Sequence, residues 1–263
     1  MSELAGKSAI VTGASRGIGA AAAKELAAQG VSVVLAARSL GESEQIATEI
    51  RTAGGKAVAV ACDVASYADV TAAVALCRKT FGGLDILVNN AGLIDPISKL
   101  ADSDPEEWVR VADVNYKGVY FGLRAAIPTM LQQGGGVIVN ISSGAATGAL
   151  EGWSHYCSSK AAVLMLTRMT HLEYASQGIR IVGLAPGTVM THMQVAIKAS
   201  GLNPISQMDS SAHATVDRPA KAIAWLCTDD AREFDGSDVS LRDEVIQHRA
   251  GLAAVSVIPF PKR

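Results

Sequence analysis

Short apolar segments alternate along the chain with longer segments whose apolar residues recur at helical spacing. The expected strands are residues 8–12, 31–36, 57–61, 86–89, 137–141 and 179–184, and the expected helices are residues 17–29, 42–53, 67–81, 105–133 and 154–176. Alternation of this kind is typical of parallel strands joined by helices. Because the strands are apolar on both faces, the pattern predicts an α/β fold in which helices cover both sides of a parallel sheet.

Right-handed crossovers turn such a sheet into a doubly wound fold, in which ligands bind at the carboxyl ends of the strands. No linker rich in proline or serine divides the sequence, so we expect a single domain over residues 1–263. Residues 192–216 are polar and are interrupted by Gly201 and Pro204. A long segment of weak pattern after a strand predicts a mobile substrate lid. The role of the tail, residues 242–263, cannot be predicted.

Composition adds limits on partners and on location. The chain is 49% hydrophobic and has a formal net charge of −2, so we expect neither a nucleic-acid partner nor a membrane-surface partner. The start of the chain lacks the pattern of a signal peptide, and the apolar stretch 163–169 is too short to cross a bilayer. Four scattered cysteines indicate reduced thiols and predict a cytoplasmic protein: Cys62, Cys77, Cys157 and Cys227.

A glycine-rich loop lies between the first expected strand and the first expected helix. Glycine at positions 13, 17 and 19 allows a tight turn and lets backbone N–H groups approach a pyrophosphate at the helix N-terminus. An unoccupied turn is the alternative, but the position after a strand and before a helix favours a dinucleotide site. The residues expected to bind there are Gly13, Ser15, Arg16, Gly17, Ile18 and Gly19.

The end of the second expected strand indicates which dinucleotide is used. A carboxylate there would bind the ribose hydroxyls and repel a 2′-phosphate, but this chain continues from Ala37 into Arg38 and Ser39. Two guanidinium groups, those of Arg16 and Arg38, together with a hydroxyl suit a phosphate dianion better than they suit a free ribose. They could also be ordinary surface arginines. We predict NADP(H) as the cofactor.

A hydroxyl, a phenol and an ammonium group follow one another in the stretch 142–160. Tyr156 and Lys160 are four residues apart, so on a helix they share one face. A cation beside a phenol lowers the phenol pKa, which suits general acid–base catalysis. Either Ser142 or Ser143 could hold the oxygen that gains or loses the proton.

Taken in order, these motifs resemble the short-chain dehydrogenase/reductase family over about residues 5–240, which implies a Rossmann fold. Tyr-x-x-x-Lys, the glycine loop and the segment Asn89 to Gly92 carry the resemblance. It implies that Asp63 and Val64 flank the adenine and that the stretch after the sixth strand covers the nicotinamide. The further cofactor residues that it implies are Asn90, Ala91, Gly92, Tyr156, Lys160, Pro186, Gly187, Val189 and Thr191.

The resemblance also implies the catalytic roles. Tyr156 exchanges a proton with the substrate oxygen, and Lys160 lowers the tyrosine pKa and binds the nicotinamide ribose. Ser143 has the family's spacing to the tyrosine, so it rather than Ser142 should polarise the carbonyl. Asn115 would hold a water molecule that links Lys160 to solvent, although it could merely interrupt a helix. The hydride chemistry belongs to the nicotinamide.

A narrower similarity links the chain with sepiapterin and benzil reductases, which reduce one carbonyl of a vicinal dicarbonyl with NADPH. The segments around Trp153 and Met190 carry it. It implies a largely apolar substrate pocket, although such residues are equally suited to a core. The expected lining is Leu93, Ile94, Pro96, Ala149, Trp153, Met190 and Met193.

Together, these implications predict an NADPH-dependent carbonyl reductase that acts on a small ketone or dicarbonyl. Two other functions are alternatives. One is an alcohol or hydroxysteroid-type dehydrogenase that works in the oxidative direction, and another is a non-catalytic sensor of the NADPH/NADP⁺ ratio. We expect no metal site, because the histidines lack metal-ligand spacing. The resemblance implies a homodimer or homotetramer that assembles through the helices within residues 105–133 and 154–176.

Overall fold

The computed structural model describes residues 2–253 and contains one parallel sheet of seven strands in the order β3-β2-β1-β4-β5-β6-β7. The strands are β1 (Ser8–Thr12), β2 (Ser32–Ala37), β3 (Lys56–Ala61), β4 (Ile86–Asn89), β5 (Gly136–Ile141), β6 (Ile179–Ala185) and β7 (Asp238–Ser240). The order reverses between β1 and β4, as in a doubly wound fold. The predicted fold class is therefore confirmed.

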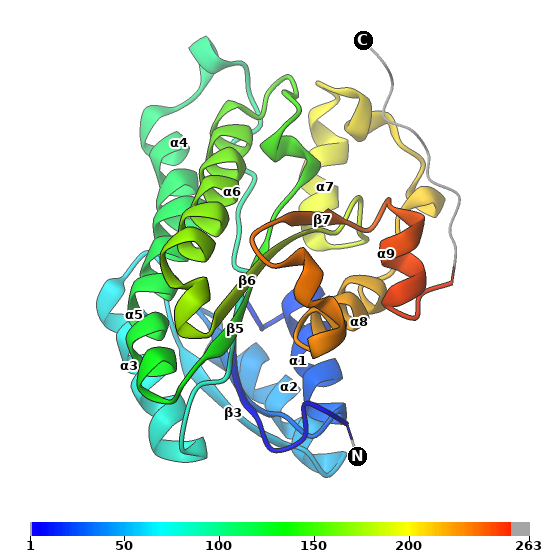
Figure 1. Cartoon of the computed structure of the whole chain (residues 1–263). Helices are drawn as coiled ribbons and strands as arrows, with labels where there is room; N and C mark the ends of the chain where they lie inside the picture. The colour runs from blue at the N-terminus through cyan, green and yellow to red at the C-terminus, as the bar shows by residue number, and fades with distance from the viewer. Residues whose placement is uncertain (1, 254–263) are drawn as a thin grey trace.

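Two layers of helices enclose this sheet, as Figure 1 shows. The helices are α1 (Gly17–Ala28), α2 (Leu40–Thr52), α3 (Tyr67–Phe81), α4 (Pro105–Ala112), α5 (Gly118–Gln132), α6 (Ser154–Tyr174), α7 (His192–Ser200), α8 (Asp217–Leu226) and α9 (Glu244–Arg249). One apolar cluster joins the sheet to α1, α2 and α8, and a second joins its other face to α3, α5 and α6. The two clusters explain why the strands are apolar on both faces.

The expected helix 105–133 is divided in the structure. A π-helical turn, Asp113–Lys117, separates α4 from α5, and Asn115 lies within this turn. The extra residue of a π turn changes the direction in which side chains point, and such turns are frequent at functional sites. Here it turns the Asn115 side chain inward, where it is completely buried.

The C-terminal third contains elements that the sequence pattern does not predict. β7 is only three residues long and pairs with β6, and α9 follows it. The predicted lid, 192–216, consists of α7 and two short 3₁₀ turns. Part of the unpredicted tail lies outside the described residues. Within residues 2–253, none of the helices combines the length and hydrophobicity needed to cross a membrane.

Candidate active site

A cavity of about 1670 Å³ lies at the carboxyl ends of the strands. Its lining begins at Gly13 directly after β1 and includes residues that follow each of the other six strands. It brings together the predicted cofactor, catalytic and substrate residues with three exceptions. Gly19, Pro96 and Asn115 do not line it.

The glycine loop has a backbone that side chains would not tolerate. Gly13 and Gly17 have φ values of +63° and +59°, in the left-handed region that favours glycine. A Cβ atom at Gly19 would lie 2.4 Å from the Gly13 carbonyl oxygen, so this glycine is required for close packing of α1 against the loop. Gly19 thus shapes the site from behind, whereas Gly13 and Gly17 face the cavity.

Thr12 and Asn90 hold the glycine loop against the end of β4. The Thr12 hydroxyl oxygen accepts hydrogen bonds from the backbone N–H groups of Asn90 at 2.9 Å and Ala91 at 3.1 Å. The Asn90 side-chain amide donates to the carbonyls of Thr12 at 2.8 Å and Gly13 at 3.2 Å. Asn90 lines the cavity, but its amide group supports the loop.

The far end of the cavity carries positive charge. Arg16 and Arg38 are exposed, and both line the cavity together with Ser39. Neither guanidinium group forms an ion pair with a residue that the structure describes. Asp63 also lines the cavity, and its carboxylate accepts a hydrogen bond from the Ala65 N–H at 3.0 Å. The cavity thus offers a glycine-lined turn at a helix N-terminus and free cations, which fits a nicotinamide dinucleotide.

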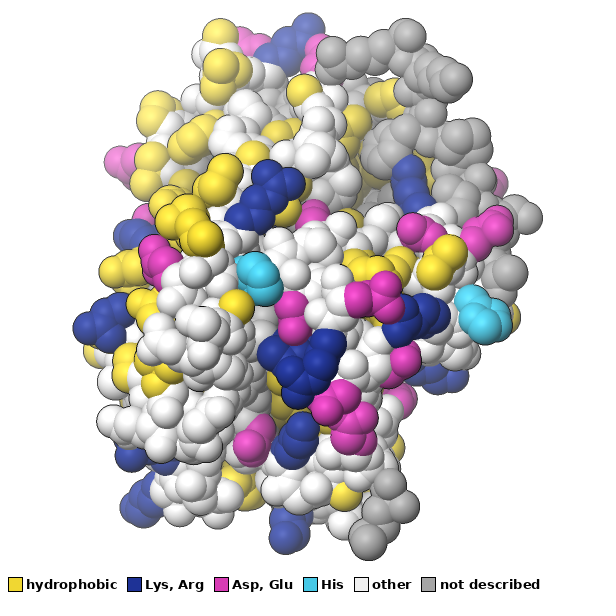
Figure 2. All heavy atoms as spheres, in the orientation of Figure 1, with side chains coloured by type: hydrophobic (Ala, Val, Ile, Leu, Met, Phe, Trp, Pro, Cys, Tyr) yellow, Lys and Arg dark blue, Asp and Glu magenta, His cyan; other side chains and the backbone are white. Residues whose placement is uncertain are grey.

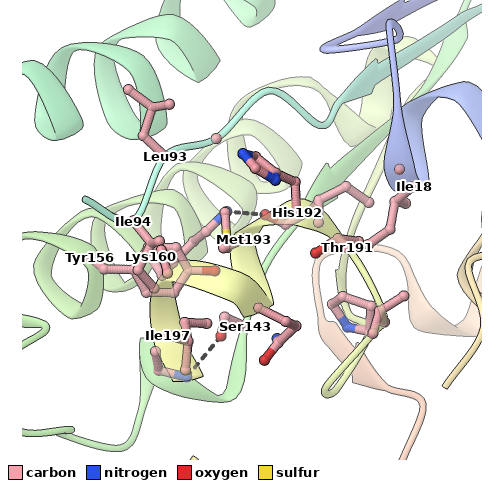
Figure 3. Close-up of a pocket in the computed structure, with 18 of the residues that line it drawn as sticks. Ile18, Leu93, Ile94, Ser143, Tyr156, Lys160, Thr191, His192, Met193 and Ile197 are labelled. Carbon is pink, nitrogen blue, oxygen red and sulfur yellow. Dashed lines mark hydrogen bonds between the residues drawn. The ribbon is translucent and has the colours of Figure 1, made fainter. Parts of the chain in front are cut away.

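Tyr156, Lys160 and Ser143 meet at the opposite end of the cavity (Figure 3). Tyr156 and Lys160 lie on α6 and are both buried. The Lys160 Nζ atom is 5.6 Å from the centre of the Tyr156 ring and donates a hydrogen bond to the Ile141 carbonyl at 2.6 Å. The neighbouring Ser142 hydroxyl instead donates to Asp238 at 2.7 Å. The Ser143 hydroxyl accepts a hydrogen bond from the Ala145 N–H at 3.2 Å. Of the two serines, Ser143 is the one whose hydrogen bonding lowers the pKa of Tyr156.

The pKa of Tyr156 differs from the expected direction. Burial raises it to about 12, and hydrogen bonding by Ser143 acts the other way without cancelling the effect of burial. Burial also lowers the pKa of Lys160, to about 8. Lys160 directs its ammonium group toward Ile141, so the predicted lowering of the phenol pKa by this cation is not found here. The phenol is fully protonated at neutral pH.

Asn115 lies behind the cavity wall. Its Oδ1 atom accepts from the Leu93 N–H at 2.7 Å, and its Nδ2 atom donates to the Leu93 carbonyl at 2.8 Å and to the Ser159 hydroxyl at 3.3 Å. It therefore ties α6 to the loop that carries Leu93 and Ile94. Its predicted role in holding a water molecule stays a prediction.

The end of the cavity that contains Trp153 and Tyr156 is apolar. Trp153 packs edge-on against Tyr156, with 5.5 Å between ring centres, and Ile94 belongs to the same buried cluster. The cluster also includes Ile197 on α7 and Ile205, so the predicted lid contributes a wall of the pocket. These two isoleucines were not predicted from the sequence, because their segment has no clear period. Neither were His192 and Arg242, which line the cavity from segments without a recognisable motif.

The chain is similar to a large group of oxidoreductases. The family model described as short chain dehydrogenase matches residues 7–201. Cyclohexanol dehydrogenase of Acinetobacter sp. strain SE19 is 36% identical over 234 residues, which cover 88% of this chain and 91% of that protein. 3β-Hydroxysteroid dehydrogenase 1 of Eggerthella lenta is 38% identical over 252 residues, covering 89% and 92%.

Reductases and a solved structure are also among the similar proteins. A 3-oxoacyl-acyl-carrier-protein reductase of Staphylococcus aureus is 34% identical over 235 residues, which cover 89% of this chain and 95% of that protein. A crystal structure from Sinorhizobium meliloti 1021, named as that of a short-chain alcohol dehydrogenase, matches with a TM-score of 0.80 at 30% identity. The match covers 90% of this chain and 94% of the other.

Proposed function

Because the chain belongs to the short-chain dehydrogenase/reductase family, we propose that it transfers hydride between NADPH and a small ketone or dicarbonyl, with Tyr156 as the general acid. One observation carries the proposal: a single cavity joins a cationic, glycine-lined end to an apolar end where Ser143 meets Tyr156. When bound, the nicotinamide supplies the hydride. The residues at the apolar end supply orientation and the proton.

A protonated phenol is the form that the reductive direction requires. A carbonyl oxygen that receives hydride on its carbon becomes an alkoxide and needs a proton. Tyr156, whose pKa is about 12, holds one at neutral pH. Ser143 can donate a hydrogen bond to the same oxygen, and Lys160 provides buried positive charge nearby.

The choice of NADP(H) rests on the two arginines. The family uses nicotinamide cofactors of either kind, and the cavity end that carries Arg16, Arg38 and Ser39 has no carboxylate from the end of β2. Guanidinium groups bind phosphate through paired charge-assisted hydrogen bonds. A 2′-phosphate at this end would give both arginines a partner.

Oxidation of an alcohol is the second candidate function. The names of the relatives favour it, because they include a cyclohexanol dehydrogenase and a hydroxysteroid dehydrogenase. Both candidates use the same residues and differ in the direction of proton and hydride transfer. The apolar lining suits a compact carbon skeleton in either case, including the vicinal dicarbonyls suggested by the resemblance to sepiapterin and benzil reductases.

We also propose that the chain forms a homodimer or homotetramer through α5 and α6. Exposed apolar side chains occur at helical spacing on α6, namely Met165, Met169 and Leu172. Tyr116 in the π turn and Tyr120 on α5, one turn apart, are also exposed. Figure 2 shows hydrophobic side chains gathered on the side of the molecule that carries α4 and α6.

The four free cysteines support a cytoplasmic location.

Turnover measurements test the proposal. NADPH and NADH oxidation should be followed with diketones, quinones, oxo-esters and pterins, and NADP⁺ and NAD⁺ reduction with cyclohexanol and hydroxysteroids. We expect NADPH-dependent reduction of at least one carbonyl compound. Turnover confined to alcohols would favour the second candidate, and tight NADPH binding without any turnover would identify a sensor and contradict both.

A further inference from the structure

A row of register-matched positions crosses four strands beneath α6. Asn89 on β4 pairs with Asn140 on β5, Asn140 with Gly183 on β6, and Gly183 with Asp238 on β7. The Asn140 amide donates to Thr167 on α6 at 3.0 Å, which shows that this row faces that helix. Asp238 thus points from a short strand toward the helix that carries Tyr156 and Lys160.

The Asp238 carboxylate occupies space that is open because Gly183 has no side chain. A Cβ atom at position 183 would lie 2.3 Å from the Asp238 Oδ1 atom, closer than any packed contact allows. The Oδ1 atom is buried and has no hydrogen-bond partner among the described residues. A buried carboxylate oxygen without a partner is unfavourable unless positive charge lies nearby.

The charged groups that face Asp238 come from α6. They are Lys160, which is buried, and Arg168, which is exposed, and both favour the ionised carboxylate. The pKa of Asp238 is nevertheless raised, because the effect of burial exceeds the lowering by Ser142, Lys160 and Arg168. In turn, Asp238 is the group that raises the pKa of Lys160 against the lowering caused by burial. His171, also on α6, packs against Gly236, which precedes Asp238 by two residues.

The carboxylate also holds the backbone of the site. Its Oδ2 atom accepts the Ser142 hydroxyl at 2.7 Å. Ser142 lies between Ile141, whose carbonyl accepts the Lys160 hydrogen bond, and Ser143, which interacts with Tyr156. The Asp238 carboxylate therefore holds Ser142, and the two residues on either side of Ser142 contact Lys160 and Tyr156.

We propose that Asp238 is a positioning residue of the active site: it anchors Ser142 and supplies the buried negative charge that offsets the burial of the Lys160 ammonium group. The inference deepens the proposed function and rests on it for the roles of Tyr156 and Lys160. Asp238 acts through these neighbours and does not line the cavity.

The direct test measures the charge of Lys160. Protein labelled with ¹³C at the lysine ε carbons is titrated by NMR, and the Lys160 signal is identified by its loss in Lys160→Met. Asp238→Asn removes the charge and keeps an oxygen for Ser142. We expect its Lys160 titration to move to lower pH by at least about half a unit, since a nearby opposite charge stabilises the charged form.

Further variants separate charge from folding and from the hydrogen bond. Asp238→Thr gives a second uncharged variant with a residue that suits a strand. Ser142→Ala removes the hydrogen bond but keeps the carboxylate, so its Lys160 titration should stay near that of the wild type. Asp102→Asn, at an exposed position, controls for net charge.

Catalysis provides the second readout. In Asp238→Asn, the fall of kcat/KM for carbonyl reduction at alkaline pH should begin at lower pH, in step with Lys160. An unmoved Lys160 titration in both uncharged variants would overturn the inference, whether or not activity or stability fell. A wild-type protein without turnover would contradict the proposed function, and the NMR titration would still decide the role of Asp238.

Discussion

The Lys160 ammonium group donates a hydrogen bond to the backbone carbonyl of Ile141 across 2.6 Å, and its side chain is almost completely buried. The lysine therefore sits at the end of β5, where the chain turns toward Ser143. Burial of this cation lowers its pKa from 10.5 to about 8. The fold thus holds a charged group where an uncharged one would be more favourable.

Lys160→Met should stabilise the protein while abolishing its activity. Below pH 8 both the folded and the unfolded wild type hold the lysine proton, so the folded state carries the full cost of the lowered pKa. At about 1.4 kcal/mol per pKa unit, that cost is on the order of 3 kcal/mol. Between pH 8 and 10.5 the unfolded state binds the extra proton, so wild-type stability gains from rising pH and the cost disappears.

Urea unfolding at pH 7 and at pH 10 measures this difference. The free energy of unfolding of Lys160→Met should exceed that of the wild type at pH 7, and the excess should shrink at pH 10. Lys221→Met, at an exposed position on α8, controls for the gain of an apolar side chain and should change little. The substitution also leaves the Ile141 carbonyl without its partner, which costs about 1–3 kcal/mol at either pH. A stability difference between Lys160→Met and the wild type that stayed the same at pH 7 and pH 10 would therefore contradict the account of the buried cation.

Arg38→Asp should reverse the cofactor preference. A carboxylate at the end of β2 would repel the 2′-phosphate and could bind the ribose hydroxyls instead. We expect the KM for NADPH to rise about tenfold or more, because removing a charge-assisted hydrogen bond costs about 1.5–3 kcal/mol. The KM for NADH should change little or fall.

Steady-state kinetics with both cofactors test the change at Arg38. Arg78→Asp, an exposed substitution on α3 with the same change in charge, serves as the matched control. If Arg38→Asp raised both KM values equally, the assignment of NADP(H) would be wrong.

Asn115→Ala should loosen the loop that carries Leu93 and Ile94. Both backbone groups of Leu93, which are partly buried, would lose their side-chain partner. A fully buried group left unpaired costs about 1–3 kcal/mol, which is an upper bound for each of the two. We expect lower stability, and weaker NADPH binding because Leu93 and Ile94 line the cavity. Asn140→Ala removes another buried amide from the sheet, so it should lower stability without the same loss of affinity.

Fluorescence titration with NADPH and thermal unfolding distinguish the two asparagines. Equal loss of affinity in Asn115→Ala and Asn140→Ala would show that Asn115 acts only through general stability. Unchanged affinity in Asn115→Ala would show that the loop keeps its position without it.

The sheet could be predicted from sequence because each strand is a short apolar run bounded by turns. The predicted range 137–141 differs from β5 by one residue, and the range 31–36 is shifted by one residue from β2. β7 could not be predicted, because Asp238 and Ser240 give its three residues a polar character. Its pairing with β6, a long-range contact, makes it a strand.

The site could be predicted where a motif lies on one local element. The Tyr156 and Lys160 pair needs only helical spacing, and the glycine loop needs only its place between a strand and a helix. The surroundings of these groups depend on distant segments. Tyr156, whose burial raises its pKa, belongs to the same apolar cluster as Ile197 and Ile205. Asp238, on β7, raises the pKa of Lys160, on α6.

Tyr156→Phe tests the central claim most directly. The substitution removes one hydroxyl from a buried ring, and Tyr174→Phe makes the same change elsewhere on α6. With the best carbonyl substrate, we expect kcat of Tyr156→Phe to fall by about a hundredfold or more, as general-acid catalysis contributes about 10²–10⁴. Its Kd for NADPH should stay within about twofold of the wild type, and Tyr174→Phe should turn over normally. A Tyr156→Phe enzyme that kept most of the wild-type kcat would contradict the account.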